Sequence, residues 1–220
     1  MKNFVKIVLV SNLVTSMFVP MLARADSTFV SPATTGSVAP AHLDFVIVVN
    51  PALFLRVSTG AANNAASNGT IDTLTFDVPS ANVGDGSEIS GTGGDLTAGA
   101  ATIRVYGNSG SLSLNSTTTG PLTSAAGDTI PWSQISVTAS ALPRPNNTAG
   151  FTSGAVPHPA FNTAPAGGDG AATTLESVNK VVRVEGRWTY TYLNANSVPA
   201  GTYGATAARN GRVTYTATQL

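Results

Sequence analysis

Residues 182–193 read VRVEGRWTYTYL, and their alternation decides the fold class. Large apolar side chains stand at every second position of most of this stretch, and polar residues stand between them. The apolar positions are Val182, Val184, Trp188, Tyr190 and Tyr192. A period of two is typical of a β-strand that buries one face. Residues 212–218, RVTYTAT, repeat the pattern, so both segments are predicted to be strands.

The same alternation recurs along the rest of the chain. It covers residues 43–49, 53–57, 71–78, 101–106, 111–116 and 129–139. No segment keeps apolar residues at the helical spacing of i, i+3, i+4 and i+7 over three turns. We therefore expect an all-β protein of about eight or nine strands, built as an antiparallel immunoglobulin-like β-sandwich with long Gly/Pro-rich loops.

The connections are rich in turn-forming residues. Gly107-Asn108-Ser109-Gly110 separates two predicted strands and favours a β-hairpin, because these residues tolerate positive φ. Glycines make residues 79–99 a predicted loop. Five prolines forbid a regular helix or a central strand around 140–172. We interpret that region as a long loop within one domain spanning 42–220, and a linker between two sub-domains is the alternative.

Residues 1–25 have the three zones of a secretion signal. Lys2 and Lys6 precede a mostly apolar stretch, and Ala23-Arg24-Ala25 forms an A-x-A cleavage site. The alternative is a membrane anchor, but the apolar stretch is short and interrupted. We expect an exported protein, located in the periplasm, at the cell surface or outside the cell. Residues 26–41 then form a flexible N-terminal arm, and the mature chain has no transmembrane segment.

Charge and composition exclude several classes of function. The chain has 11 basic and 11 acidic residues; residues 1–25 hold three basic and no acidic ones, which leaves 8 against 11 and a net charge near −3. Such a balance does not favour nucleic-acid binding. The chain has no cysteine, which excludes thiol chemistry. Its low content of charged residues suits self-association or contact with other exported surface proteins.

Residues suited to catalysis are few. The two histidines, His42 and His158, lie in unrelated contexts, and no metalloprotease, nucleophile-elbow or phosphate-binding motif is present. Acidic residues beside glycine could bind calcium, but their spacing fits no calcium loop and is typical of turns. These acidic residues are Asp85, Glu88, Asp95 and Asp169. We expect no enzyme, no metal site and no cofactor.

Trp188, Tyr190 and Tyr192 form the one candidate ligand-binding set. Spaced two apart, they share one face of a predicted strand. If that face is exposed, the rings form a platform on which sugars stack. If it faces inward, the same rings belong to the hydrophobic core.

The C-terminal region resembles a known group of proteins. Ala200-Gly201-Thr202-Tyr203, followed by the closing strand at 212–218, is similar to the end of Gram-negative pilin-like and spore-coat-U-like β-sandwich subunits. The resemblance implies an incomplete immunoglobulin-like fold that the N-terminal arm of the next subunit completes. In this chain, residues 28–41 or 43–49 would be the donated strand.

These observations favour a non-catalytic exported structural or adhesive protein, with a pilus-like or surface-assembly subunit as the most specific form. The alternative is an extracellular carbohydrate-binding module that uses the aromatic row. A hydrolase with a site assembled from scattered residues is a third hypothesis, for which no nucleophile or base can be named.

Overall fold

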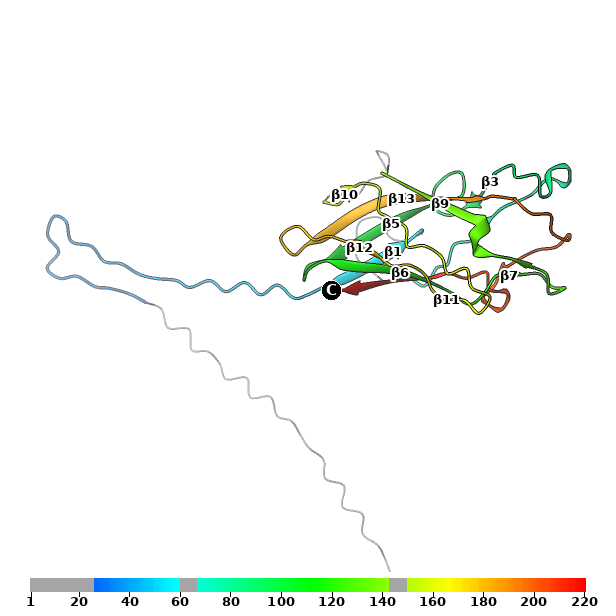
Figure 1. The fold of residues 1–220 in the computed structure, drawn as a ribbon. Coiled ribbons are helices and arrows are strands. Elements are labelled where there is room, and N and C mark those ends of the chain that lie inside the picture. The colour runs from blue at the N-terminus through cyan, green and yellow to red at the C-terminus, as the bar shows by residue number, and fades with distance from the viewer. Residues whose placement is uncertain (1–25, 60–66, 143–149) are drawn as a thin grey trace, which may run out of the picture. The chain divides into compact units, whose positions relative to one another are not determined.

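The computed structural model describes residues 26–59, 67–142 and 150–220 (Figure 1). The predicted signal peptide, residues 1–25, lies outside the described residues. The chain divides into one unit that ends at Val49 and a larger unit, Asn50–Leu220. Regular structure in the described ranges is β-strand, apart from the 3-10 helices η1 (Ser80–Asn82), η2 (Trp132–Gln134) and η3 (Ala207–Arg209). The all-β prediction is confirmed, and none of the helices described is long and apolar enough to cross a membrane.

The larger sheet is built around β13 (Val182–Tyr192), the strand predicted from the alternation at 182–193. β5 pairs antiparallel with Val182–Thr189, and β1 continues the sheet beyond β5. β9 pairs antiparallel with the second half of β13, and β3 adds a short antiparallel pairing. β10 pairs parallel with β13, so the larger sheet is not antiparallel throughout as predicted. These partners are β1 (Leu53–Val57), β3 (Ile89–Ser90), β5 (Ala100–Gly107), β9 (Ile135–Ser140) and β10 (Thr152–Ser153).

The second sheet is built around β6 (Leu112–Thr118). β14 (Thr214–Gln219) pairs antiparallel along one edge of β6, and β12 (Thr173–Leu175) and β11 (Gly168–Asp169) share the other. The remaining strands form two small two-stranded sheets. They pair β2 (Leu74–Thr75) with β4 (Thr92–Gly93) and β7 (Leu122–Thr123) with β8 (Thr129–Ile130).

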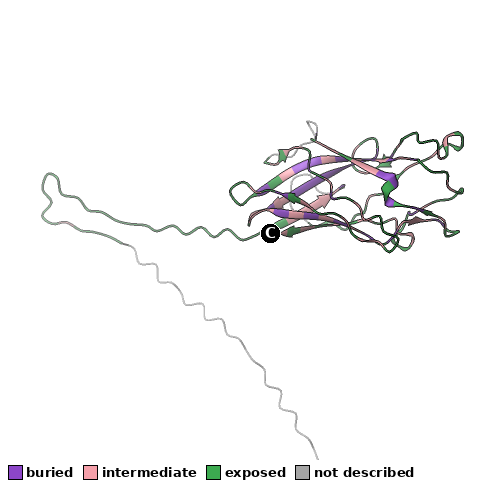
Figure 2. Ribbon diagram, viewed as in Figure 1, coloured by how far each residue is buried: buried purple, intermediate pink, exposed green. Residues whose placement is uncertain are grey.

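The core of the larger unit lies between these two sheets. Figure 2 shows the buried residues concentrated along the strands of both layers. Ile103 and Val105 of β5 are 0% exposed, as is Leu112 of β6, and Leu114 is 1% exposed. They belong to one hydrophobic cluster that joins the two sheets. The alternation in sequence is therefore the consequence of each strand burying one face.

The predicted hairpin at Gly107–Gly110 is wrong. β5 and β6 flank these residues but belong to different sheets. β5 already has β1 on one edge and β13 on the other, so no edge is left for β6. The connection is an arch between the sheets, held by Asn108, whose Oδ1 accepts from Ala52 N and whose Nδ2 donates to Asn50 O.

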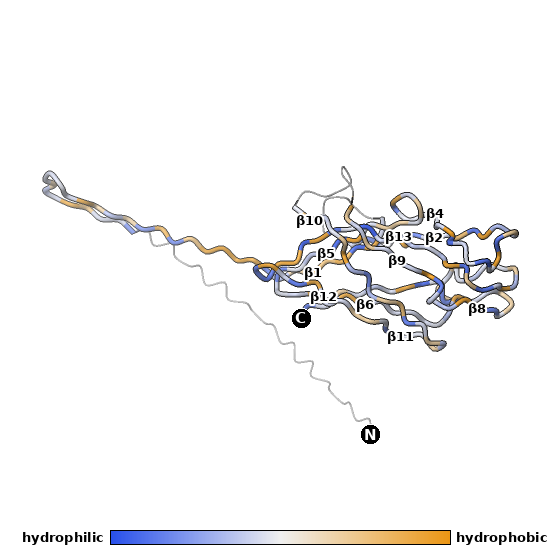
Figure 3. The backbone as a smooth tube through the Cα atoms, turned by 45° about the horizontal axis from the view of Figure 1, so that its top comes forward, coloured by the Kyte–Doolittle hydropathy of each residue, from blue (hydrophilic) through white to orange (hydrophobic). Residues whose placement is uncertain are grey.

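Residues 43–49, predicted to be the first strand, form no strand in the structure (Figure 1). Figure 3 shows that the segment leading into the larger unit is mostly hydrophobic. They precede the larger unit, which begins at Asn50. Of the strand predicted at 71–78, only β2 is formed. An alternating sequence favours an extended backbone, but a strand also needs a neighbour to accept its hydrogen bonds.

The proline-rich region around 140–172 is more ordered than predicted. Residues 143–149 lie outside the described residues, but β10 and β11 pair with the two main sheets. Between them, Val156 is 3% exposed and Phe161 packs against the core. Proline prevents ladder pairing but not burial, so this segment fills space between the sheets.

Candidate functional site

The aromatic row predicted as a ligand platform lies in the core. Trp188 is 1% exposed, and Tyr190 and Tyr192 are each 5% exposed. The indole Nε1 of Trp188 donates to Val156 O at 2.8 Å, which fixes the proline-rich segment on the strand. Because these rings are buried, they offer no surface on which a sugar could stack. The row faces the core, which was the second of the two arrangements considered.

His158 lies inside the same aromatic cluster. Its ring centroid is 4.6 Å from that of Trp188 and 4.8 Å from that of Phe161, both edge-on. Its Nε2 is 2.8 Å from Tyr215 Oη, which in turn is 3.1 Å from Tyr190 Oη. Burial lowers the pKa of His158 to about 4, so the ring is neutral at pH 7. The histidine thus contributes to packing.

His42, in the N-terminal unit, is exposed. Its Nδ1 lies 2.5 Å from Asp26 Oδ2, a contact between two residues near the ends of the predicted arm. Between them, Ser37 N donates to Thr34 O in a turn. Residues 26–42 therefore fold back on themselves.

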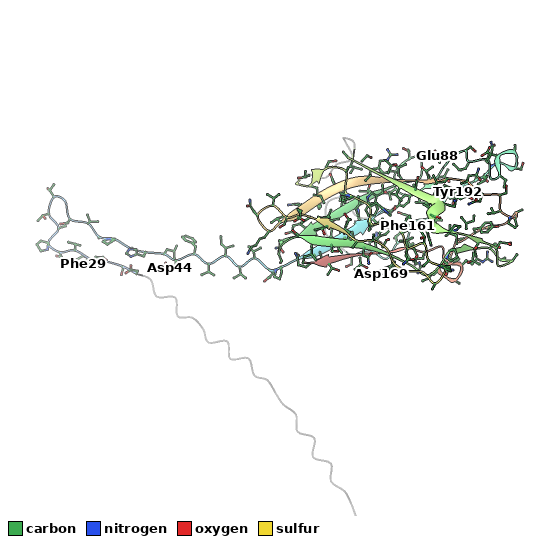
Figure 4. The ribbon with its side chains drawn as sticks, viewed as in Figure 1. Phe29, Asp44, Glu88, Phe161, Asp169 and Tyr192 are labelled. Carbon is green, nitrogen blue, oxygen red and sulfur yellow. The ribbon has the colours of Figure 1, made fainter. Side chains whose placement is uncertain are left out.

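Three of the four acidic residues considered for calcium, Asp85, Asp95 and Asp169, accept hydrogen bonds from protein groups. Ser87 and Asn82 donate to Asp85 and hold its pKa below the usual value. Asp95 accepts from Thr102 N at 2.7 Å, and Asp169 from Thr117 Oγ1 at 2.6 Å. Figure 4 shows Glu88 and Asp169 in separate places. Over the residues that the structure describes, no three His, Cys, Asp or Glu side chains are arranged to hold a metal ion.

The domain has two open sheet edges on one side. β1 ends the larger sheet, and β14 pairs with β6 alone among the described strands. The two edge strands contact each other across the sandwich. Their inward side chains, which include Leu55 and Val57 of β1 and Tyr215 and Ala217 of β14, pack on the core but are only partly buried. The core is therefore incompletely covered along this side.

The N-terminal unit carries the largest exposed apolar run. From Leu43 to Val49, six of seven residues are large and apolar, and Asp44 is the exception. Their exposed fractions are 77% for Leu43, 83% for Phe45, 86% for Val46, 87% for Ile47, 78% for Val48 and 75% for Val49. Monomeric soluble proteins rarely expose a contiguous apolar run of this size. Such runs usually mark a surface that contacts another molecule.

No protein-family model, no curated protein and no solved structure matches this chain. Its class is therefore defined by the fold itself, as an all-β protein with two facing sheets.

The alternation predicts residues 43–49 as the first strand of the sandwich, while the resemblance offers either these residues or residues 28–41 as a donated strand. The resemblance implies an incomplete fold, but the sequence could not locate the open edges, because a strand lies at an edge only when no further strand pairs with it. One signal was available: both faces of residues 43–49 are apolar apart from Asp44. A strand with water on one side normally has a polar face there.

Proposed function

We propose that this chain is a non-catalytic, exported structural protein with an immunoglobulin-like sandwich, and that its copies assemble through Leu43–Val49. That segment adds as a strand to the open sheet edge of a second copy. The observation that carries the proposal is the exposure of six large apolar side chains in this segment, each at 75% or more. Pairing satisfies its backbone and buries one of its faces in the same step.

β14 is the edge best suited to accept the segment. Along β14, inward Tyr215 and Ala217 alternate with exposed threonines. In the segment, Leu43, Phe45, Ile47 and Val49 share one face with the same period of two. An added strand therefore places this apolar face over the partly covered core. Such strand addition gains main-chain hydrogen bonds together with side-chain burial.

The test is the oligomeric state of the mature chain, measured by light scattering over a range of concentrations. We expect multimers for the wild type. Ile47→Asp should yield monomers, because a charge cannot be buried unpaired in the acceptor. Val38→Asp is the matched control, since Val38 is 75% exposed in the same unit but lies outside the segment. A strictly monomeric wild type, or unchanged multimers in Ile47→Asp, would refute the proposal.

A further inference from the structure

A row of three aromatic residues and one arginine crosses the outer face of the larger sheet. In the strand register, Phe54 of β1 is opposite Tyr106 of β5, which is opposite Arg183 of β13. Phe151 directly precedes β10, whose first residue pairs with Val184. The four strands are neighbours in that order (Figure 1). The three rings are partly exposed, and Arg183 is exposed.

The guanidinium of Arg183 is held in place from several sides. Its Cζ lies 5.0 Å from the ring centroid of Phe151 and 5.8 Å from that of Tyr106. Gly150 leaves room for it, because a Cβ there would come 2.9 Å from Nη2. No carboxylate in the described ranges lies within ion-pair distance of this group. Arg183 is thus a fixed cation whose donors are not used by a carboxylate of the described chain.

The adjacent row of the same face holds two further arginines, and both have carboxylates nearby. There Arg56, Arg104 and Glu185 lie opposite one another across β1, β5 and β13. Glu185 pairs with Arg104, and the negative charges of Asp95 and Glu185 both act on Arg56. Burial, and next the charge of Arg104, lower the pKa of Arg56, as expected for cations placed close together. The charges of that row are therefore compensated within the protein, and Arg183 is the cation of this face that is exposed to a ligand.

We propose that Phe54, Tyr106, Phe151 and Arg183 form a binding site for an acidic saccharide. A carboxylate or sulfate group of the sugar accepts hydrogen bonds from the planar fork of Arg183. The sugar ring then stacks on the exposed part of Tyr106 or Phe54. A long polyanion fits less well, because the one exposed arginine of this site cannot neutralise many charges. The site is independent of the assembly proposed above, since it lies on a sheet face.

The experiment is calorimetric titration of the mature chain with three short oligosaccharides of equal length. The probes are an oligogalacturonate, a heparin-derived oligosaccharide and a neutral galactose oligomer. We expect at least one acidic probe to bind saturably, with a salt-dependent Kd, and the neutral probe to bind at least about tenfold more weakly. Carboxylate and sulfate sources are distinguished by which acidic probe binds more tightly.

Two substitutions assign the binding to this row. Arg183→Gln should raise the Kd for the acidic probe by about tenfold or more, because a charge-assisted bidentate contact is lost. Arg212→Gln removes an exposed arginine elsewhere and should leave the Kd within about twofold. The proposal is overturned if neither acidic probe binds, if Arg183→Gln binds as well as the wild type, or if a polyglutamate peptide of equal charge binds as tightly as the saccharide.

Discussion

Arg104 and Glu185 form an ion pair that is almost completely removed from water. Arg104 Nε lies 2.6 Å from Glu185 Oε2, and their side chains are 6% and 0% exposed. The two residues lie directly opposite each other on β5 and β13, next to Ile103 and Gly186. The pair therefore sits at the centre of the larger sheet, on the face turned away from the core. A buried charge of this kind depends on its partner, because neither group can return to water while the sheet is folded.

Glu185→Gln should destabilise the domain strongly. The substitution keeps the size of the side chain but removes the negative charge that lies beside the buried guanidinium of Arg104, a change that costs about 3–5 kcal/mol. Urea unfolding followed by tryptophan fluorescence measures the loss. Glu88→Gln, at an exposed acidic residue, is the control and should change the free energy of unfolding by less than about 0.5 kcal/mol. Equal effects of the two substitutions would contradict the role given to the pair.

Gly170→Ala should disrupt the docking of the proline-rich segment. A Cβ at Gly170 would overlap the carbonyl oxygen of Ala160 and come 2.8 Å from Ser116 Oγ. The backbone must shift to admit it, so we expect a loss of about 1–3 kcal/mol. Gly154→Ala is the matched control, because a Cβ there meets nothing within 4 Å. Thermal unfolding that shows the same Tm for both variants would argue against close packing of this segment.

The strands could be predicted from sequence where one face is buried. β13 and β14 were found because their apolar residues recur with a period of two, and that period is set by burial. Pairing could not be predicted in the same way. Gly107–Gly110 has turn residues that suit either a hairpin or an arch, and only the occupied edges of β5 decide between them.

The candidate sites were harder to predict than the fold. Trp188, Tyr190 and Tyr192 form an obvious row in sequence, but periodicity does not tell an inner face from an outer one. In the outer row, Phe54, Tyr106 and Arg183 lie on three separate strands, so no local sequence pattern predicts that they are neighbours. Such a site becomes visible only through the register that aligns the strands.

The free energy of unfolding should decrease as the pH falls, because His158 is buried in its neutral form. Its folded pKa is about 4, below the ordinary value of 6.5, so the unfolded chain binds more protons between these two values. The stabilising contribution is complete above about pH 6.5 and is lost as the pH falls toward 4. At pH 5 we expect a loss of about 2 kcal/mol relative to pH 8.

Urea unfolding at pH 8, 6 and 5 measures this dependence. His158→Gln removes the titrating group and should reduce the difference between pH 8 and pH 5 by most of that amount, even if the variant is less stable at every pH. Val156→Ala is the control, because it truncates a buried side chain beside the same cluster without removing a titrating group, so the difference between pH 8 and pH 5 should stay as in the wild type. If the free energy of unfolding changes equally between pH 8 and pH 5 in His158→Gln and in the wild type, other groups cause the acid sensitivity.

Disulfide trapping tests the proposed pairing of Leu43–Val49 with β14 of a second copy. Antiparallel pairing is slightly more stable per residue than parallel pairing. In the antiparallel register that sets Phe45 opposite the small Ala217, Ile47 lies opposite Tyr215 and Val48 opposite the exposed Thr214. Directly opposite residues are close enough for a disulfide. The chain has no cysteine of its own, so every disulfide in a variant must come from the introduced cysteines.

We therefore expect the double variant Val48→Cys/Thr214→Cys to form a ladder of covalent multimers on a non-reducing gel after mild oxidation. Val48→Cys/Thr218→Cys is the matched control, since Thr218 is equally exposed but lies opposite Val48 only in a parallel arrangement with overlap of the same length. A ladder in the control alone would establish the parallel orientation. If multimers form and neither pair cross-links, β14 is not the accepting edge, and the open edge of β1 takes its place.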